Sequence, residues 1–114
     1  MVRQYIPDRG DIVWLNFTPQ SGHEQIGKRP ALVLSPKQYN SKVGLAVFCP
    51  ITSHEKGYPF EVNIPGQLKI NGVILADQLK SLDWRARAAK FVDRAPESVI
   101  NECSLKIKAL LIIS

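Results

Sequence analysis

The sequence predicts a mainly β protein with a C-terminal α-helix, in which a small, strongly bent sheet or barrel packs against that helix. Three observations predict this class. Short apolar runs follow one another at short spacing, turn residues separate them, and only the end of the chain has the period of a long amphipathic helix. The 114 residues contain no linker, repeat or low-complexity segment, so we expect one domain over 1–114.

The first half of the chain supplies three predicted strands. Residues 11–17 are rich in β-branched and aromatic side chains, which favours a strand. The continuous apolar run 31–34 lies between prolines and predicts a buried strand, and residues 45–52 repeat this pattern. Residues 36–44, between these two runs, predict a short helical turn or an irregular connection.

The second half of the chain continues the β pattern. Residues 58–64 alternate apolar and polar side chains with a period of two, which predicts a half-buried strand. Pro65-Gly66 and Asn71-Gly72 are typical of turns. Further strands are predicted over residues 73–76, 79–82 and 85–92.

The one long helix is predicted to begin at Pro96, because proline is favoured in a first helical turn and Glu97 complements the positive end of the helix dipole. Its apolar side chains form one stripe, made of Val99, Ile100, Cys103, Ile107, Leu110 and Leu111. Its polar side chains face away from that stripe, namely Ser98, Asn101, Glu102, Lys106 and Lys108.

The charge of the chain favours a polyanionic partner. Fifteen Lys and Arg against ten Asp and Glu give a formal net charge of +5, and such cations drive non-specific binding to nucleic acids. Charge alone does not separate RNA from DNA or from an acidic protein. No apolar run approaches the roughly 20 residues that span a bilayer, and the N-terminus lacks the apolar core of a secretory signal, so we expect a cytoplasmic protein.

The cysteines and histidines predict neither a disulfide nor a metal site. Cys49 and Cys103 lie far apart within apolar surroundings, where buried free thiols are expected. His23 and His54 stand without the close-spaced Cys or His partners that a zinc site needs. We therefore predict no metal and no cofactor.

The polar segment 21–30 is the first candidate for a reactive site. It places His23, Glu24, Lys28 and Arg29 with two glycines between two apolar runs. A base, a proton source and a phosphate-binding guanidinium are what RNA cleavage without a metal requires, and glycines let the backbone approach a substrate. A hairpin loop of this composition is also compatible with a plain solvated turn.

Several short motifs occur in an order and spacing that resemble one protein family. They are Gly10-Asp11-Ile12-Val13, Gly22-His23-Glu24-Gln25, Arg29-Pro30-Ala31-Leu32-Val33-Leu34-Ser35, Pro50-Ile51-Thr52, Gly57-Tyr58-Pro59-Phe60-Glu61-Val62, Ala76-Asp77-Gln78 and Trp84-Arg85-Ala86-Arg87. Together they resemble the MazF/PemK toxins from Asp8 to the final helix. The resemblance implies an SH3-like barrel that forms a homodimer, and a toxin of a type II toxin–antitoxin system that inhibits translation and growth.

The activity implied by the resemblance is sequence-specific cleavage of single-stranded RNA without a metal, which leaves a 2′,3′-cyclic phosphate and a 5′-hydroxyl. Arg29 matches the catalytic arginine of the family, and a planar guanidinium suits phosphate oxygens. Thr52 matches its second catalytic position, where a hydroxyl can bond the scissile phosphate. Glu24 is a candidate general base, although a surface ion pair with Lys28 or Arg29 is its plain alternative.

A second branch of the family relies on a loop histidine with an aspartate and an arginine. His23 and Asp77 match that set, but Leu75 stands where the branch places its arginine. We therefore expect Arg29 and Thr52 to be the core of the catalytic site, assisted by His23, Glu24 and Asp77. Asp77 has a structural alternative as a buried carboxylate that ties neighbouring loops together.

RNA is expected to contact strand ends and loops through stacking and charge. The candidate residues are Trp14, Asn16, Phe17, Lys28, Lys56, Tyr58, Gln78 and Lys80. Trp14 and Phe17 fall on opposite faces of a strand, so at most one is expected on the inner side. Lys56, beside Gly57, is a candidate for a loop that closes on RNA, or for an ordinary hairpin tip.

Two other functions compete with RNA cleavage. A gyrase-poisoning toxin of the CcdB type shares the architecture, but residues 108–114 lack the exposed tryptophan that such a poison uses. A non-catalytic RNA-binding module would bind RNA without cutting it. The expected partners are RNA, a second copy of the chain with residues 110–113 as a possible interface, and an antitoxin whose acidic, partly disordered tail blocks the RNA groove.

Overall fold

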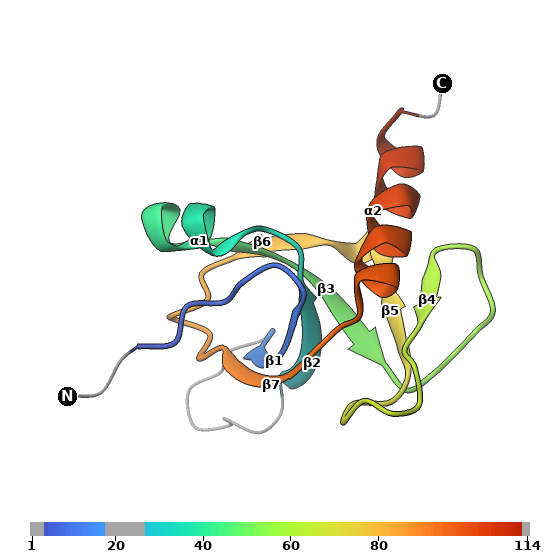
Figure 1. Ribbon diagram of the computed structural model, residues 1–114, viewed down its shortest axis with the longest axis horizontal. Helices are drawn as coiled ribbons and strands as arrows, with labels where there is room; N and C mark the ends of the chain where they lie inside the picture. Colours follow the sequence, from blue (N-terminus) through green and yellow to red (C-terminus); the bar gives the residue numbers. More distant parts are fainter. Residues whose placement is uncertain (1–3, 18–26, 113–114) are drawn as a thin grey trace.

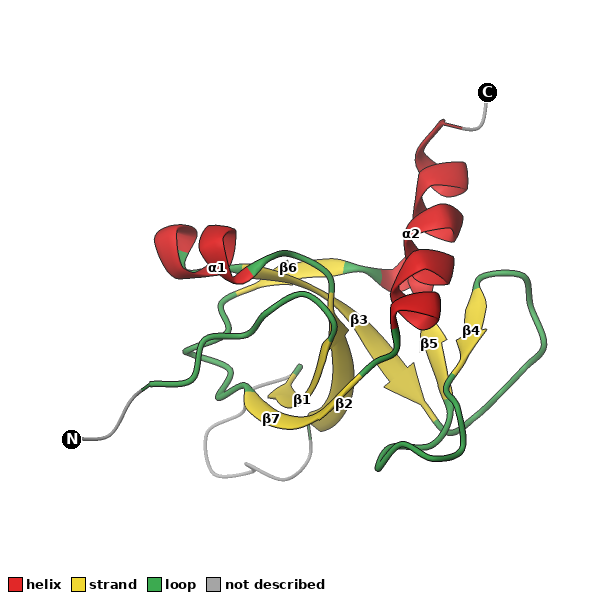
Figure 2. Ribbon diagram, viewed as in Figure 1, coloured by secondary structure: helices red, strands yellow, loops and turns green. Residues whose placement is uncertain are grey.

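The computed structural model describes residues 4–17 and 27–112 of the chain. Its strands are β1 (Asp11–Asn16), β2 (Lys28–Val33), β3 (Ala46–Thr52), β4 (Glu61–Asn63), β5 (Val73–Leu75), β6 (Lys80–Leu82) and β7 (Lys90–Arg94). Its helices are α1 (Lys37–Val43), the 3-10 turn η1 (Ala76–Gln78) and α2 (Glu97–Ile112). The predicted class, strands followed by one long terminal helix, is confirmed (Figure 2).

All strand pairings are antiparallel, and the sheet runs in the order β4-β5-β3-β2-β1-β7, with β6 beside β3. The long strand β3 bends the sheet, because its first half pairs with β6 and its second half pairs with β5 (Figure 1). β7 reaches β1 from near the other end of the chain, with Asp11 opposite Arg94. A register shift between Ile12 and Val13 accompanies this pairing and adds local twist.

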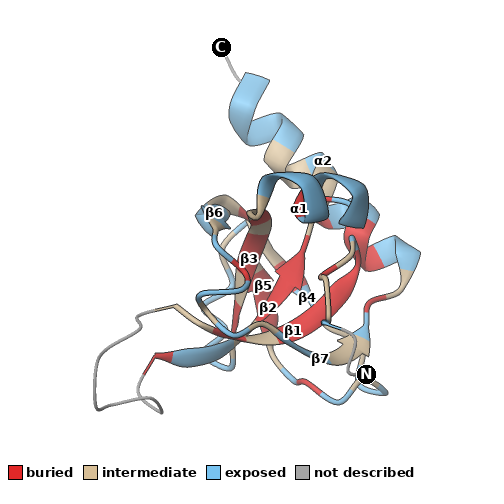
Figure 3. Ribbon diagram, turned by 90° about the vertical axis from the view of Figure 1, so that its left-hand side faces the viewer, coloured by how far each residue is buried: buried red, intermediate tan, exposed pale blue. Residues whose placement is uncertain are grey.

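The central strands bury side chains on both faces, and much of β1, β2 and β3 is red in Figure 3. One face belongs to a cluster that includes Ile12, Leu32, Cys49, Ile51, Val99, Ile100 and Cys103. The other face belongs to a cluster of Val13, Leu15, Ala31, Val33, Ala46, Phe48 and Trp84. Strands covered on both faces read as continuous apolar runs, which is why 31–34 and 45–52 showed no alternation.

Helix α1 settles the connection that the sequence left open between a helical turn and an irregular segment. Its fully buried Asn40 donates from the side-chain nitrogen to the carbonyls of Pro7 (2.8 Å) and Ser35 (3.0 Å). The indole nitrogen of Trp84 donates to the Asn40 carbonyl at 3.0 Å. One asparagine therefore fastens α1 to the N-terminal segment and to the turn that begins at Trp84.

Three predicted strands have boundaries that differ from the structure by more than one residue. β2 begins at Lys28 rather than residue 31, because Arg29 and Lys28 pair with Leu15 and Asn16 of β1. β4 covers only Glu61–Asn63 of the predicted strand 58–64. Residues 84–88 form a turn closed by the bond from the Ala89 amide to the Trp84 carbonyl (3.0 Å), so β7 starts at Lys90 instead of residue 85.

Helix α2 begins at Glu97, one residue after the predicted start, and buries only the first half of its apolar stripe. Val99, Ile100 and Cys103 are buried, whereas Leu111 is 70% exposed. The last turns project beyond the sheet, as Figures 1 and 3 show. None of the described helices combines the length and apolar character that crossing a membrane requires.

Candidate active site

A hollow of about 380 Å³ lies where the start of β2 meets the end of β3. We call it the Arg29 hollow; it is lined by Trp14, Arg29, Pro30, Ile51, Thr52, Ser53, His54, Lys69, Ile70 and Asn71. The β2–β3 register pairs Ala31 with Pro50, and two further steps place Arg29 across from Thr52. The structure therefore brings together the two residues that the sequence put first.

The Arg29 hollow is electropositive. Its lining holds the guanidinium of Arg29 and the ammonium of Lys69, and none of the described residues that line it is a carboxylate. Arg29 is exposed, and no described carboxylate forms a salt bridge with it. Lys69 is fixed through its backbone, because its amide donates to the Asp93 carboxylate at 3.0 Å. Two cations facing one space suit an anionic ligand.

Thr52 is held firmly at the end of β3. Its hydroxyl oxygen accepts a 3.1 Å hydrogen bond from the backbone amide of His54. Gly72 packs against the Thr52 carbonyl with φ +125°, and a Cβ on Gly72 would overlap that carbonyl oxygen. Only glycine fits this close approach, so the turn at residue 72 fixes the strand end that carries the Thr52 hydroxyl.

A second hollow, of about 270 Å³, adjoins the first. We call it the Lys56 hollow; it is lined by Thr52, His54, Lys56, Tyr58, Glu61, Leu75 and Gln78. Thr52 and His54 line both hollows and form the wall between them. Three predicted RNA contacts, Lys56, Tyr58 and Gln78, share this second space.

The loop over the Lys56 hollow has a defined shape. The Glu61 carboxylate accepts 2.8 Å hydrogen bonds from the amides of both Lys56 and Gly57. The ammonium of Lys106, from α2, donates to the carbonyl of Pro59 and, at 3.1 Å, to that of Glu61. Lys106 thus turns toward the loop and does not face away from the body as the sequence suggested.

Asp77 lies in η1 and acts on the Lys56 hollow through Tyr58. Its carboxylate accepts a 2.7 Å hydrogen bond from the Tyr58 hydroxyl. Desolvation, followed by this hydrogen bond and the charge of Asp77, raises the pKa of Tyr58, so the phenol remains a donor. Asp77 itself lines neither hollow.

Four predicted RNA contacts lie outside both hollows. Lys80 stands 6.0 Å from the centre of the Phe17 ring, and Lys28 pairs with Asn16 across β1 and β2. Arg87 holds this region together, because its guanidinium donates to the carbonyls of Asn16 (3.2 Å) and Phe17. Trp14 and Phe17 pack against opposite clusters, and both are partly buried, so each face of β1 takes one aromatic ring.

His23 and Glu24 lie outside the described residues.

Sequence reasoning missed His54, Lys69 and Asn71 as lining residues of the Arg29 hollow. His54 carried a usable signal, because it stands two positions after Thr52 at a strand end. Lys69 and Asn71 carried none, since only the hairpin between β4 and β5 brings them to Arg29.

Within residues 4–17 and 27–112, no three His, Cys, Asp or Glu side chains are grouped so that they could hold a metal ion. Cys49 and Cys103 are buried free thiols, as predicted. Burial raises the pKa of each thiol to about 12, so both stay protonated at neutral pH.

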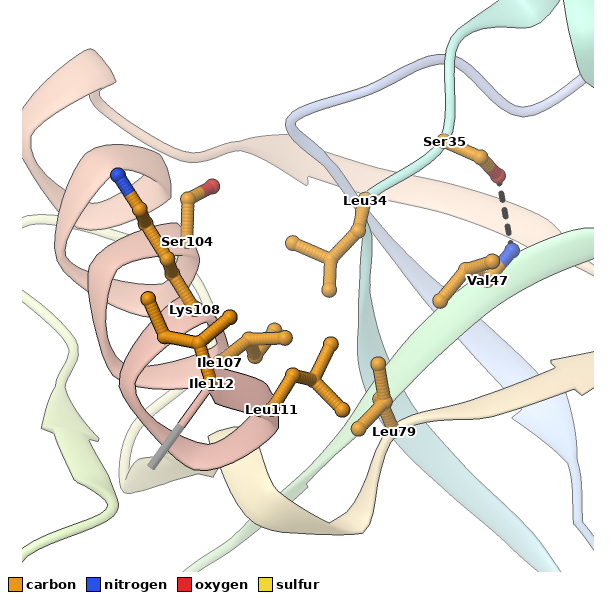
Figure 4. Close-up of a pocket in the computed structure, with 9 residues that line it drawn as sticks. All are labelled: Leu34, Ser35, Val47, Leu79, Ser104, Ile107, Lys108, Leu111 and Ile112. Carbon is orange, nitrogen blue, oxygen red and sulfur yellow. Dashed lines mark hydrogen bonds between the residues drawn. The ribbon is translucent and has the colours of Figure 1, made fainter. Parts of the chain in front are cut away.

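An apolar groove of about 460 Å³ separates the last turns of α2 from the sheet. We call it the helix groove; it is lined by Leu34, Ser35, Val47, Leu79, Ser104, Ile107, Lys108, Leu111 and Ile112. Figure 4 shows Leu34, Leu79 and Leu111 pointing toward one another across it. Its lining is mostly apolar, in contrast to the two hollows.

The chain is similar to bacterial toxins over most of its length. Residues 8–111 match the family described as PemK-like, MazF-like toxin of type II toxin–antitoxin system. The endoribonuclease toxin MazF of Escherichia coli K12 is 55% identical over 89 residues, which are 78% of this chain and 79% of that protein. A crystal structure of MazF from Deinococcus radiodurans has 56% identity and a TM-score of 0.87 over 95% of this chain and 98% of that one. A MazE-MazF crystal structure from the same organism has 50% identity and a TM-score of 0.87 over 97% and 100% of the two chains.

The fold, the basic hollow and these relatives define the class of the protein: it is an endoribonuclease toxin. The chain belongs to the PemK-like, MazF-like toxins of type II toxin–antitoxin systems. The family and the architecture that the sequence motifs implied are thereby confirmed. The gyrase-poisoning and non-catalytic alternatives gain no support from these relatives.

Proposed function

We propose that this toxin cleaves single-stranded RNA at specific sequences, without a metal, by attack of a ribose 2′-oxygen on the adjacent phosphorus. The products are a 2′,3′-cyclic phosphate and a 5′-hydroxyl, and loss of mRNA inhibits translation and growth. The observation that carries this proposal is the Arg29 hollow, where a guanidinium, a fixed threonine hydroxyl and a second cation face one space.

Charge that builds on the phosphoryl oxygens is the main barrier that this site would lower. The guanidinium of Arg29 donates two parallel hydrogen bonds to such oxygens and stays positively charged. The Thr52 hydroxyl accepts from the His54 amide, so its own hydrogen is free to point at the phosphate. Lys69 adds a second positive charge, and preorganised donors of this kind stabilise the transition state.

The RNA strand would cross the wall that the two hollows share. With the scissile phosphate above Thr52, one neighbouring nucleotide lies against Trp14 in the Arg29 hollow and the other against Tyr58 in the Lys56 hollow. Lys56 and Gln78 then contact the second nucleotide. Outside the hollows, the strand continues over Asn16, Phe17, Lys28 and Lys80, and we assign His23, Glu24 and Asp77 to supporting roles.

The protein would act in the cytoplasm as a homodimer that an antitoxin neutralises. The helix groove and the exposed Leu111 and Ile112 supply apolar surface of the kind that a second copy buries. An acidic, partly disordered antitoxin segment would bind the positively charged hollows and exclude RNA. A MazE-MazF structure at 50% identity supports such a partner.

The test is cleavage of a long unstructured RNA in EDTA, with the matching DNA and the Arg29→Ala variant as controls. Discrete cuts that end in cyclic phosphates, absent with DNA and with the variant, are expected. RNA that stays intact with folded protein would overturn the proposal and direct attention to gyrase binding. RNA that is bound but never cut would instead indicate a non-catalytic RNA-binding module.

A further inference from the structure

His54 lies at the wall that the two hollows share. It follows the end of β3, it lines both hollows, and its side chain is exposed. Its backbone amide donates a 3.1 Å hydrogen bond to the Thr52 hydroxyl oxygen. This bond fixes the backbone from which the imidazole projects. A phosphate placed between Arg29 and Thr52 therefore lies beside this imidazole.

The other ionisable side chains that line the hollows are either cations or hydrogen-bonded within the protein. The guanidinium of Arg29 and the ammonium of Lys69 are suited to stabilising negative charge on a phosphate. The Glu61 carboxylate is occupied by the amides of Lys56 and Gly57 at 2.8 Å each. The Tyr58 hydroxyl is bonded to Asp77 at 2.7 Å.

Imidazole is the side chain that gains and loses a proton between pH 5 and 8. His54 is the only histidine among the described residues. Its side chain is therefore the one imidazole among the described residues that line the hollows. The charged groups that surround it are Arg29 and Lys69 on one side, and Lys56 and Glu61 on the other. It is thus placed to handle a proton at the shared wall.

We propose that His54 is the general acid that protonates the 5′-oxygen of the leaving nucleotide, an assignment that rests on the proposed function. The 2′-oxygen gives its proton to water and forms a bond to phosphorus. The bond between phosphorus and the 5′-oxygen breaks, its electron pair stays on that oxygen, and the oxygen takes a proton from the His54 imidazolium. The neutral imidazole then regains a proton from water.

The test compares two substrates that differ only in the leaving atom. A cleavage site is first mapped on ordinary RNA, and the same site is then prepared with sulfur in place of the bridging 5′-oxygen. A thiolate leaves without being protonated, so it needs no general acid. Single-turnover cleavage of both substrates is measured for the wild type, His54→Gln and the neighbouring loop variant Glu55→Gln, which lines neither hollow.

We expect His54→Gln to cleave ordinary RNA about 10²–10⁴-fold more slowly, the usual contribution of a general acid. It should cleave the sulfur substrate within a few-fold of the wild-type rate, and Glu55→Gln should match the wild type on both. Binding of a 2′-deoxy analogue and the thermal melting curve should be unchanged, which separates chemistry from folding.

Two results would overturn the assignment alone: an equal loss on both substrates, or no loss on ordinary RNA. If the wild type cleaves neither substrate while remaining folded, the proposed function fails, and the assignment of His54 fails with it. The wild-type measurement therefore distinguishes the two failures.

Discussion

The Tyr58 hydroxyl donates a 2.7 Å hydrogen bond to the Asp77 carboxylate, which joins the loop after β3 to the η1 turn. These residues lie nineteen positions apart in the sequence. The bond sets the position of the Tyr58 ring in the Lys56 hollow. Asp77 therefore ties two loops together, as its structural alternative predicted, although the residue is only partly buried and not buried as expected.

The Tyr58–Asp77 bond predicts energetic coupling between the two residues. A double-mutant cycle with Tyr58→Phe and Asp77→Ala should give a coupling energy of about 1 kcal/mol, because one hydrogen bond is removed in either single variant. Urea unfolding measures the stability of all four proteins. RNA affinity should also fall by a similar factor in both single variants. Purely additive losses of stability would show that the bond contributes nothing.

We predict that cleavage depends on the planar, bidentate guanidinium of Arg29 and not only on its positive charge. Arg29→Ala should lower kcat by about 10²–10³-fold, the usual effect of removing a transition-state donor, and Arg29→Lys should recover only part of that loss. Single-turnover cleavage in EDTA measures both. Lys42→Ala, an exposed cation on α1, serves as the matched control and should keep the wild-type rate. Full activity in Arg29→Lys would contradict the bidentate role.

Gly72 is predicted to be essential for the geometry of Thr52. Gly72→Ala should destabilise the protein by more than about 1 kcal/mol and lower the cleavage rate, because the added methyl displaces the Thr52 carbonyl and φ is +125°. Gly66→Ala is the control, since nothing lies within 4 Å of its Cβ position. Thermal melts and RNA cleavage should separate the two variants clearly; equal behaviour would refute the close approach.

The cations of the two hollows should appear in the salt dependence of RNA affinity. Each phosphate contact to single-stranded nucleic acid contributes about 0.7 to the slope of log K against log salt. Lys56→Ala and Lys69→Ala should each reduce that slope by about this amount, as measured by fluorescence anisotropy with a non-cleavable RNA. An unchanged slope in either variant would place that lysine outside the RNA path. Lys42→Ala again provides the control.

The buried thiols predict that stability falls in alkaline solution. Desolvation raises the pKa of Cys49 and of Cys103 from 9.0 to about 12 in the folded protein. Unfolding frees both thiols to ionise above pH 9, so their stabilisation is complete below pH 9 and is lost progressively toward pH 12. Urea midpoints at pH 7.5 and 10 should show this loss, and the variant with both cysteines replaced by alanine should show a smaller loss. An equal loss would exclude the thiols as its source.

Local patterns predicted most of the elements and missed those that depend on distant contacts. The strand at 11–17 was recognised by its β-branched and aromatic side chains, and the strand at 45–52 was recognised because it is apolar on both faces. Residues 85–88 were predicted as strand, but they belong to a turn that starts from Asp83. The Asp83 carboxylate accepts hydrogen bonds from the amides of Arg85 (3.0 Å) and Ala86 (2.9 Å), a local signal that the strand prediction overlooked. Local pattern does not reveal the bond from the Trp84 indole to the Asn40 carbonyl, which joins residues forty-four positions apart and holds this turn against α1.

The candidate site divides in the same way. Arg29 and Thr52 could be picked out as residues, but their opposition follows from the register of β2 on β3. Lys69 enters the Arg29 hollow through a hairpin whose packing no spacing rule describes. His54 was set aside because it lacked metal-ligand neighbours in the sequence, whereas in the structure it lines the same hollow as the cations Arg29 and Lys69.

The pairing of β1 with β7 has a consequence for when this protein acquires its shape. Asp11 faces Arg94, so the sheet cannot be completed until residue 94 has left the ribosome. Closing so long a loop is entropically costly, and sheets rich in distant contacts fold slowly. β1 is therefore synthesised well before β7, the strand that completes its pairing. During that delay the newly made toxin chain lacks the completed sheet that carries Arg29.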